Sequence, residues 1–475
     1  MAAIGGAMSF DVAIIGGGIS GLATAQSLRE KGLRVAVLER QVRAGGNAVS
    51  ERIGGFLMEH GPSSLNAGSP VALQASHKLG LDAKRCDLGA GVRQRYLVRD
   101  GRLHGISVRP LGLFASNYLS LAGRTRLLIE PLVPARRGGA DESVAAFFTR
   151  RFGREFAERL VDPLVGGLFA GDAGSLSLKA AFPRMAKMEA SHGSILVAAA
   201  KARMAARSMP GRRLFSWRDG VGSLPKTLAA GLGSALHTGV AVRRLRQAGR
   251  RWRVETARHG TIDAGAVVIA TQPHVAAGLV ESLQPVSCEA LAAIAAPPLA
   301  VVFLGYTRRH ISHPLDGLGY LTPSSEQRLV SGVLFCSTMF AGRAPEGQVA
   351  LAAYVGGRRA PQAAALPERD LIDLVEGELH DLVGAVGPPT VARVRHWSRG
   401  IPQLDLGHGA RMADIHMALT EHPGLFLSGN YFDGVSVTAC LERAGETAEQ
   451  VAGYLMEAGR DEVWMQESFA DMAKI

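Results

Sequence analysis

The sequence predicts an α/β protein of α+β character, built from several domains: a Rossmann-type nucleotide-binding domain, a mainly β domain and a helical insertion. Three observations support this fold class. The apolar run Val12–Ile15 enters a glycine-rich turn and then a helical pattern, which is the order of a parallel sheet with covering helices. Comparable apolar runs at Ala266–Thr271 and Leu425–Leu427 indicate that later segments re-enter the same sheet. Residues 297–405 instead alternate short strand patterns around one amphipathic helix, 369–383.

The N-terminal glycine turn has the pattern of an adenine-dinucleotide site. Gly16 permits the tight turn, Gly18 lets backbone amides approach a pyrophosphate, and Gly21 allows the next helix to pack close to the strand. The helix N-terminus adds unsatisfied N–H groups and the positive end of its dipole. Glu39 ends the second strand, where a carboxylate can accept hydrogen bonds from ribose hydroxyls. The predicted contacts are Gly16, Gly17, Gly18, Ile19, Ser20, Gly21, Glu39 and Arg40. This pattern does not separate FAD from NAD.

Length and composition limit the class of protein. The 475 residues can form two or three domains, and 47% hydrophobic with 20% charged residues argues against wholesale disorder. The four cysteines are far apart and form no C-x-x-C pair, which favours free thiols over disulfides or a zinc site. Residues 1–10 lack the charged region of a signal peptide, and no apolar run approaches about 18 residues. We therefore expect a cytoplasmic protein without a metal site or a membrane-spanning helix.

The net charge of +11 comes from many arginines and leaves several interpretations open. A solvated surface, a patch for anionic lipid and a site for a polyanionic substrate all fit. No nucleic-acid module accompanies the charge, so nucleic acid is not an expected partner. Residues 106–137 hold five arginines and one acid among leucines and aromatic residues. This basic, amphipathic stretch can lie on a membrane surface, or its leucines can form the core of a helical domain.

Two motifs after Glu39 resemble the flavin-containing amine oxidases. These are the R-x-G-G element Arg43–Gly46 and the G-P-x-S turn Gly61–Ser64. The resemblance implies that the cofactor is FAD, with the arginine and glycines along the pyrophosphate and the turn near the flavin ring. Asn47 departs from the family pattern, because relatives usually carry Lys or Arg at this position.

Later parts of the chain continue this resemblance. Val242 stands where relatives place a strand valine over the adenine, and the helix after Gly434 points its N-terminus at the N1/O2 side of the flavin. The FAD contacts implied by the family motifs are Arg43, Gly46, Gly61, Pro62, Ser63, Ser64, Val242, Trp397, Gly429, Asn430, Gly434, Val435, Ser436 and Val437.

Three further motifs resemble one group of these enzymes, the protoporphyrinogen oxidases. They are Leu168–Asp172 with Leu176–Leu178 and Ala181–Pro183, Ile401–His408, and Gly434–Cys440. The first is similar to the GxFAGD…LS…FP element of the group, and the second to its IPQY..GH turn. The third resembles its C-terminal GV-x-V-x-D-C, although Thr438 and Ala439 replace the more usual pair ending in Asp. The resemblance spans nearly the whole chain.

The resemblance implies that FAD oxidises a porphyrinogen through successive two-electron transfers to flavin N5, with oxygen or another acceptor then reoxidising the flavin. No catalytic side chain is implied, because the redox chemistry belongs to the cofactor. Arg95 occupies the position where the group binds a propionate, and Leu168 and Phe169 are candidates to sandwich the ring. An ordinary surface role for Arg95 and core packing for Phe169 are the competing interpretations.

Other functions remain open at this stage. Protoporphyrinogen IX is the first candidate substrate, and coproporphyrinogen III, which carries four carboxylates instead of two, is the nearest alternative. An isoprenoid desaturase or dehydroxylase would use the same FAD motifs without needing Arg95. An escort-type carrier is a non-enzymatic alternative, although such a protein has no need to keep the glycine turn, Glu39 and Arg43.

The predicted domains follow from these motifs. Residues 1–85, 211–296 and 406–475 form the FAD-binding domain, 86–106 and 297–405 the mainly β substrate domain, and 107–210 the helical insertion. Within them we expect one hairpin that joins 95–98 to 103–106 at Gly101, a second that joins 236–245 to 252–256, and a helix over 111–121. By resemblance, the insertion attaches the protein peripherally to the cytoplasmic face of a membrane. A homodimer also remains open.

Overall fold

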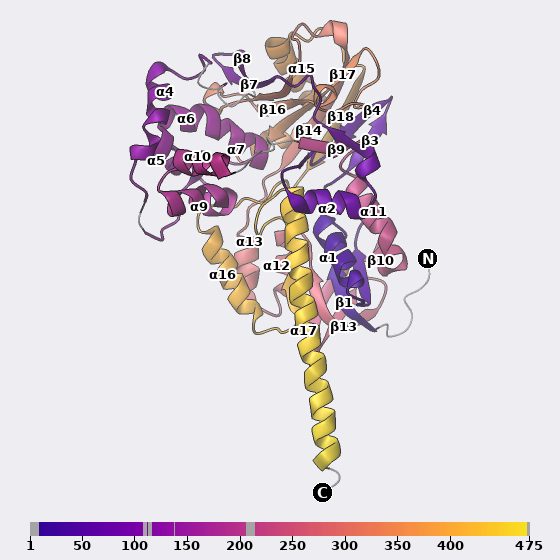
Figure 1. Ribbon diagram of the computed structural model, residues 1–475. Coiled ribbons are helices and arrows are strands. Elements are labelled where there is room, and N and C mark those ends of the chain that lie inside the picture. Colours follow the sequence, from indigo (N-terminus) through magenta and orange to yellow (C-terminus); the bar gives the residue numbers. More distant parts are fainter. Residues whose placement is uncertain (1–8, 108–111, 113–115, 137, 206–213, 473–475) are drawn as a thin grey trace.

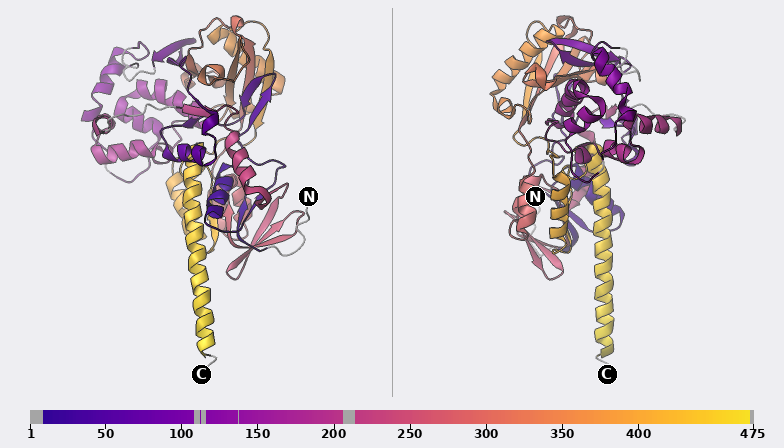
Figure 2. Two further views of the ribbon diagram at one scale, coloured as in Figure 1. Left: turned by 45° about the vertical axis from the view of Figure 1, so that its right-hand side comes forward. Right: turned by 90° about the vertical axis from the view of Figure 1, so that its left-hand side faces the viewer.

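The computed structural model describes residues 9–107, 112, 116–136, 138–205 and 214–472, and it contains two large sheets and a separate group of helices (Figure 1). The sheet with the glycine turn lies beside the long C-terminal helix α17 (Val437–Met472), and the second sheet lies at the opposite end of the body. The helical insertion projects to one side, and α17 continues well beyond the body (Figures 1 and 2).

The first sheet has the strand order β10-β2-β1-β13-β12-β11, with β19 beside β13. Its strands are β1 (Ser9–Ile15), β2 (Val35–Glu39), β10 (Leu236–Thr238), β11 (Val242–Ala248), β12 (Arg251–Thr256), β13 (Thr261–Ile269) and β19 (Leu425–Leu427). β1 pairs in parallel with β2 and β13. The first part of β13 pairs antiparallel with β12, and its last part pairs in parallel with β19. Three separate segments of the chain therefore build one sheet, as the apolar runs predicted.

The prediction of a hairpin between 236–245 and 252–256 is partly wrong. Residues 236–238 form β10 and pair with β2, while the hairpin joins β11 to β12. The physical reason lies at Gly239, whose φ of +74° turns the chain out of β10, and whose N–H donates to the Gln41 carbonyl.

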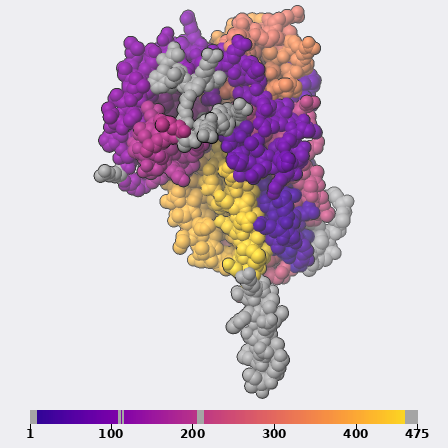
Figure 3. Space-filling model, in the orientation of Figure 1, coloured from indigo at the N-terminus to yellow at the C-terminus, as the bar shows by residue number. Residues whose placement is uncertain are grey.

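Helices cover both faces of this sheet. One face packs against α1 (Ile19–Glu30), α11 (Ser223–Leu232) and the first part of α17, and the other against α12 (Pro273–Val280), α13 (Pro285–Ala292) and α16 (His408–Leu419). Val12 and Ile14 enter the first core and Ala13 and Ile15 the second, which is the alternation that a strand buried on both faces requires. The first part of α17 also reaches the surface, between α16 and α1 (Figure 3).

The second sheet has the order β18-β14-β17-β16-β15-β7-β8. Its strands are β7 (Gln94–Arg99), β8 (Arg102–Ser107), β14 (Leu299–Thr307), β15 (Gly317–Leu321), β16 (Val330–Phe335), β17 (Gln348–Gly356) and β18 (Val391–Trp397). Helix α15 (Glu368–Val383) covers the outer face. The predicted hairpin at Gly101 is confirmed, because β7 pairs with β8 across Asp100 and Gly101, which both have positive φ.

The inner face of the second sheet packs on the nucleotide-binding part of the chain. Val301 and Phe303 of β14 and Ala352 of β17 share a buried cluster with Phe56 and Met58. Phe56 and Met58 belong to β4 (Phe56–Glu59), which pairs with β3 (Ser50–Ile53). A further small sheet joins β5 (Leu65–Asn66), β9 (Leu214–Trp217) and β6 (Arg85–Asp87).

The helical insertion contains seven described α-helices and one π-helical segment. They are α4 (Leu121–Leu128), α5 (Val144–Phe152), α6 (Arg154–Phe156), the π segment Ala157–Val161, α7 (Asp162–Phe169), α8 (Leu178–Ala181), α9 (Pro183–His192) and α10 (Ile195–Ala205). The helix predicted over 111–121 is not found in 116–120, because 116–119 form bends and α4 begins only at Leu121, and residues 111 and 113–115 lie outside the described residues. No helix in the described ranges is long and apolar enough to cross a membrane.

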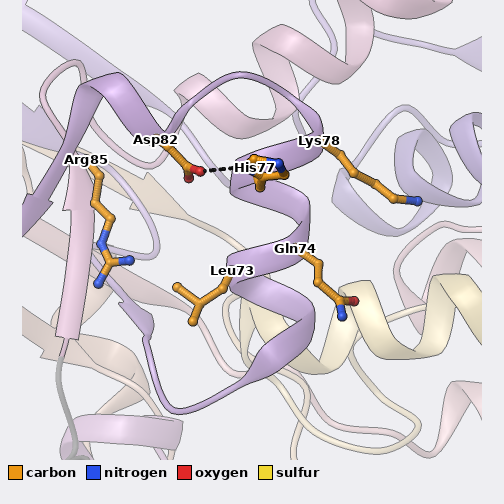
Figure 4. Close-up of a pocket in the computed structure, with 6 residues that line it drawn as sticks. All are labelled: Leu73, Gln74, His77, Lys78, Asp82 and Arg85. Carbon is orange, nitrogen blue, oxygen red and sulfur yellow. Dashed lines mark hydrogen bonds and ion pairs between the residues drawn. The ribbon is translucent and has the colours of Figure 1, made fainter.

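Short helices complete the chain. These are α2 (Pro70–Lys78), α14 (Cys336–Met339), and the 3₁₀ turns Asp82–Lys84, Glu130–Leu132, Gly233–Ala235, Arg308–His310, Ser324–Glu326 and Pro361–Ala365. An open hollow of about 830 Å³ lies over α2 and is lined by Leu73, Gln74, His77, Lys78, Asp82 and Arg85 (Figure 4). His77 there contacts Asp82 at 3.0 Å. None of the predicted site residues lines this hollow, so it is separate from the candidate active site.

A buried ion pair holds the insertion together. Arg151 and Glu130 are both fully buried and contact each other. Glu130 also accepts hydrogen bonds from the Ser194 hydroxyl and from the backbone N–H groups of Ile195 and Leu196, at the start of α10. Burial opposes ionisation of Glu130, but these donors together hold its pKa below the usual range.

Replacing Glu130 by Gln should destabilise the protein, because the change removes the fully buried carboxylate that contacts Arg151 and leaves this buried arginine with only Glu189, at 3.4 Å. We expect a loss of about 3 kcal/mol in free energy of unfolding, measured in urea at neutral pH against the exposed control Glu346→Gln. The folded pKa of Glu130 lies below its usual value of 4.5, so its contribution is present above pH 4.5 and is lost as the pH falls through the folded pKa. A difference between the two variants that stays constant down to strongly acidic pH would contradict this account.

Candidate active site

The glycine turn lies at the carboxyl end of β1, where β2 and β13 also end. Gly16 has a φ of +109°, and a Cβ there would lie 2.7 Å from the carbonyl oxygen of Ala270, after β13. The Gly17 N–H donates to Glu39 Oε2 at 2.7 Å, which places the carboxylate directly beside the turn. A Cβ on Gly18 would meet nothing within 4 Å, so the start of α1 is open to a ligand. This arrangement is the one that the dinucleotide pattern predicted.

The R-x-G-G element folds back onto the glycine turn. Gly45 N donates to the Gly17 carbonyl at 2.7 Å, and a Cβ on Gly46 would lie 3.2 Å from the Cα of Gly18. Arg43 is half-buried and donates to the Gly46 carbonyl at 3.3 Å. The loop therefore brings a cation and closely packed backbone beside the open start of α1.

A second arginine that sequence reasoning missed adds to this charge. Burial, then repulsion from Arg395, lowers the pKa of Arg43. The Arg395 guanidinium stacks over the Trp397 ring at 4.3 Å, and its buried Nε has no hydrogen-bond partner among the described residues. Two half-buried like charges next to an open helix N-terminus fit an anionic group such as the pyrophosphate of FAD. The period of two along β18 puts Arg395 on the same face as Trp397, and this signal was available in the sequence.

Trp397 also contacts the segment that leads into the G-P-x-S turn. Its Nε1 donates to the His60 carbonyl at 2.7 Å, immediately before Gly61. A Cβ on Gly61 would lie 2.1 Å from the carbonyl oxygen of Asn47, so backbone packs on backbone here. The departure at Asn47 changes a side chain and leaves this contact intact. Pro62, Ser63 and Ser64 follow in partly exposed positions.

Glu59, which precedes this turn, is a second residue that the motifs missed. Its buried carboxylate accepts hydrogen bonds from the Ser50 hydroxyl and the Val221 N–H, and lies 3.6 Å from the buried Arg343. Arg343 comes from the second sheet domain and also donates to the Ser216 hydroxyl. Burial raises the pKa of Glu59 to about 7, although Ser50, Arg343 and Val221 all favour the ionised form.

The C-terminal motif returns to the same place. Gly434 has a φ of +142°, and the Ser436 hydroxyl accepts a hydrogen bond from Ala439 N at the start of α17. Val437 and Cys440 share a core cluster with Ile19 of α1. The N-termini of α1 and α17 thus lie side by side, as a site for the pyrophosphate and the flavin part of one cofactor requires. Gly429 and Asn430 follow β19 directly, and Val242 lies partly buried against the other face of the sheet.

The candidate substrate residues lie on different elements. Phe169 is buried at the end of α7 and packs edge-on against Phe182 at 5.5 Å, which favours the core interpretation of its ring. Leu168 is 52% exposed. Val435 packs against the cluster that contains Phe169, so the C-terminal flavin motif and the insertion meet. Arg95 is exposed on β7, opposite Ile106 of β8, and its role stays a prediction.

Tyr354 is a further candidate that the motifs did not indicate. It lies on the inner face of β17, partly exposed, in the group of residues that also packs Cys336 and Trp397 against the inner-face cluster. Burial raises the pKa of its phenol, so the side chain is a neutral aromatic group over a wide pH range. Its sequence context, an aromatic residue in an apolar strand, is typical of ordinary core, so pattern alone gave no functional signal.

Comparison with known proteins fits this geometry. A profile of the flavin containing amine oxidoreductase family matches residues 19–452. The chain belongs to this family. Protoporphyrinogen oxidase 2 of Arabidopsis thaliana is 30% identical over 484 residues, covering 95% of each chain. Coproporphyrinogen III oxidase of Bacillus subtilis is 28% identical over 472 residues, covering 94% of this chain and 98% of its own.

Solved structures support the fold independently of the motifs. A structure from Exiguobacterium sp. 255-15 superposes with a TM-score of 0.80 at 22% identity, covering 94% of this chain and 99% of its own. Cyclohexylamine oxidase from Brevibacterium oxydans has a TM-score of 0.68 at 18% identity, with the same coverage. The predicted α/β architecture is confirmed.

Family membership makes the protein an FAD-dependent oxidoreductase, which confirms the cofactor and the enzyme class predicted from the sequence. The escort-type carrier is correspondingly disfavoured. FAD supplies hydride acceptance and electron transfer when bound. We expect Glu39 to hold the ribose, Gly18 and Arg43 the pyrophosphate, and the start of α17 the flavin end.

Gly21→Ala should abolish FAD retention. A Cβ at this position would lie 2.0 Å from the Gly16 carbonyl oxygen, so α1 must move away from the turn that binds the pyrophosphate. We expect the flavin absorbance of the purified variant to fall to about a tenth of wild type or less, which corresponds to at least about 1.4 kcal/mol of binding. The control is Gly278→Ala in α12, where a Cβ meets nothing within 4 Å. A folded Gly21→Ala protein with its full flavin content would refute the assignment.

Proposed function

We propose that the enzyme oxidises a porphyrinogen to the porphyrin, with protoporphyrinogen IX as its first candidate substrate. The observation that carries this proposal is a single junction between the motifs of the group. Gln403 Nε2 donates to the carbonyls of Phe169 and Ile401 at 2.9 and 2.8 Å, and Ser177 N donates to the Leu404 carbonyl at 2.8 Å. Motifs far apart in the sequence therefore meet beside the C-terminal flavin motif.

The surfaces around this junction suit a flat, apolar ring. The inner face of the second sheet is apolar where it packs on β4 and carries the partly exposed Tyr354, and α7 presents the half-exposed Leu168 toward solvent. A porphyrinogen is a large apolar macrocycle with anionic propionates at its rim, so an apolar slot with cations near its mouth is the expected site. Arg95 is our candidate for a propionate.

The similar proteins support this class of substrate over the isoprenoid alternative. The Arabidopsis relative is named for protoporphyrinogen and the Bacillus subtilis relative for coproporphyrinogen III. Both cover nearly the whole chain at comparable identity. The net charge of +11 keeps the substrate with more carboxylates open.

Anaerobic mixing of the FAD-loaded enzyme with each porphyrinogen tests the proposal. We expect protoporphyrinogen IX to bleach the flavin absorbance, because the first two electrons leave the macrocycle as a hydride for the flavin. Admitting oxygen, which reoxidises the flavin, should then let the remaining electrons leave and produce the porphyrin Soret band. Bleaching by coproporphyrinogen III alone would replace the substrate and keep the reaction. Bleaching by neither would refute the porphyrinogen assignment, provided that dithionite still reduces the bound flavin as a control.

We further infer that the insertion attaches the enzyme to a membrane surface. Four apolar side chains on α4 and the turn after it are exposed, namely Leu121 (75%), Leu128 (64%), Ile129 (48%) and Leu132 (82%). Leu127 of the same helix is buried, so the stretch supplies both core and surface leucines. A cluster of exposed leucines beside arginines is the composition expected of an interfacial helix. In Figure 1 α4 lies at the outer margin of the insertion.

Replacing Leu128 and Leu132 together by Ser should weaken membrane binding, because it removes apolar surface available to the lipid. We expect the fraction of enzyme that sediments with vesicles of phosphatidylglycerol and phosphatidylcholine to fall at least about fivefold, roughly the loss of 1 kcal/mol. The matched control is Val386→Ser with Met417→Ser, two exposed apolar residues on other elements. Equal binding by both double variants, or no binding by wild type, would refute the attachment.

A further inference from the structure

Helix α7, which carries Leu168 and Phe169, is held at its N-terminal end by the substrate domain. Its first residue, Asp162, accepts a hydrogen bond from Arg359 Nη2 at 2.7 Å and from the backbone N–H of Ser324 at 2.8 Å. The same Arg359 nitrogen donates to the Asp162 carbonyl, and Nη1 donates to the Thr322 carbonyl at 3.1 Å. One guanidinium thus joins the helix to the loop that follows β15.

The C-terminal end of α7 is held by the segment after β17, which also contains Arg359. Ala170 ends the helix in the left-handed region, with a φ of +48°, and its carbonyl accepts a hydrogen bond from Arg358 N at 2.8 Å. Gly357 permits this approach, because a Cβ there would lie 2.4 Å from that carbonyl oxygen. The Arg358 side chain continues to Asp405 at 3.4 Å. Two consecutive arginines after β17 therefore hold the two ends of one short helix.

Two glycines allow α7 to lie close to the sheet. A Cβ on Gly166 would lie 2.8 Å from the Arg359 Cζ, and a Cβ on Gly167 would lie 2.4 Å from the Leu321 Cδ2 of β15. The backbone of the helix at these two glycines therefore faces Arg359 and Leu321 directly, with no side chain between them. The distance between α7 and the inner-face strands is set by the guanidinium on one side and by a leucine on the other.

We propose that Arg359 is a positioning residue for substrate binding: by holding α7 against β15 and the segment after β17, it fixes where Leu168 and the end of α7 stand in the wall of the site for a planar tetrapyrrole. This proposal rests on the proposed function for the identity of the ligand. Arg359 lies two residues before Pro361–Ala365 and five after Tyr354, so one short segment supplies both an aromatic side chain of the inner face and the residue that holds α7. Lysine cannot replace it, because its single nitrogen cannot occupy the two positions from which Nη1 donates to the Thr322 carbonyl and Nη2 to Asp162.

The test compares Arg359→Lys with Arg369→Lys, an exposed arginine whose partner Asp373 is one helical turn away. We expect Arg359→Lys to keep its FAD content and to raise KM for the porphyrinogen about tenfold, with kcat within about twofold, since the flavin side is untouched. The porphyrin product should bind correspondingly more weakly, measured by quenching of flavin fluorescence. Arg369→Lys should match wild type in every measurement.

Gly166→Ala supplies an independent perturbation of the same contact. Its Cβ would displace the guanidinium, so it should raise KM in the same direction, while Arg359→Lys with Gly166→Ala should be no worse than the more affected single variant. Additive effects would overturn the proposal, because they would mean that the two residues act separately. Gly278→Ala is the matched glycine control.

The two proposals fail differently. If wild type acts on neither porphyrinogen, the proposed function fails. The role of Arg359 in holding α7 is then tested separately, by amide hydrogen exchange over residues 163–170. Faster exchange in Arg359→Lys than in Arg369→Lys supports the role of Arg359 in holding α7, and equal exchange overturns it. If wild type is active and Arg359→Lys keeps its KM, Arg359 does not position α7 for substrate binding, whatever the substrate.

Discussion

The contact of α1 with β1, where Gly21 lies on the Gly16 carbonyl, is the constraint on which the rest of the site depends. It brings the helix N-terminus to the carboxyl ends of three parallel strands and leaves Gly18 open. Every other element of the cofactor site is placed relative to this one. Gly45 donates to the turn, Glu39 accepts from it, and α17 packs its own N-terminus beside that of α1. Long insertions separate these segments in the sequence. They do not disturb the sheet, because each segment pairs with its neighbouring strand in a fixed register.

The parts of the site that could be predicted from the sequence are those whose geometry is local. The turn at Gly16, the acid at Glu39 and the hairpin at Gly101 each follow from residues within one strand, turn or helix, and the structure has all three. Residues whose role depends on distant partners could not be found this way. Arg343 contacts Glu59 and Arg359 contacts Asp162 only because separate domains meet, and no spacing in the chain encodes those meetings. The error at 236–245 has the same origin, since the partner of β10 is β2.

The cofactor site and the candidate substrate site are held together by different kinds of contact. The cofactor site is built from one sheet with helices on both faces, whereas the candidate substrate site lies where an insertion helix meets the inner strands of another sheet. Such a site depends on a few polar contacts between elements, here those of Asp162, Gln403 and the Gly357–Arg359 loop. Substrate preference can therefore change through this loop and through α7 without altering the flavin side. Relatives named for different porphyrinogens, both aligned along nearly the full chain, are compatible with that separation.

Two buried glutamates show how the number of hydrogen-bond donors around a carboxylate decides whether its pKa is lowered or raised. Glu130 and Glu59 are both buried beside a buried arginine, and burial raises the pKa of each. Glu130 has Arg151 in direct contact and three further donors, so its pKa is lowered overall. Glu59 has two donors and an arginine at 3.6 Å, so burial prevails and its pKa rises to about 7.

The signs of the two pH dependences are therefore opposite. The pKa of Glu59 is raised from 4.5 to about 7, so its contribution to stability is complete below pH 4.5 and is lost as the pH rises through about 7. The contribution of Glu130 is lost in the acidic direction instead. Because Glu59 directly precedes the turn at Gly61 and contacts Arg343 of the substrate domain, the junction between the flavin side and the substrate side becomes less stable as the pH rises through neutrality, while the helical insertion keeps its own ion pair.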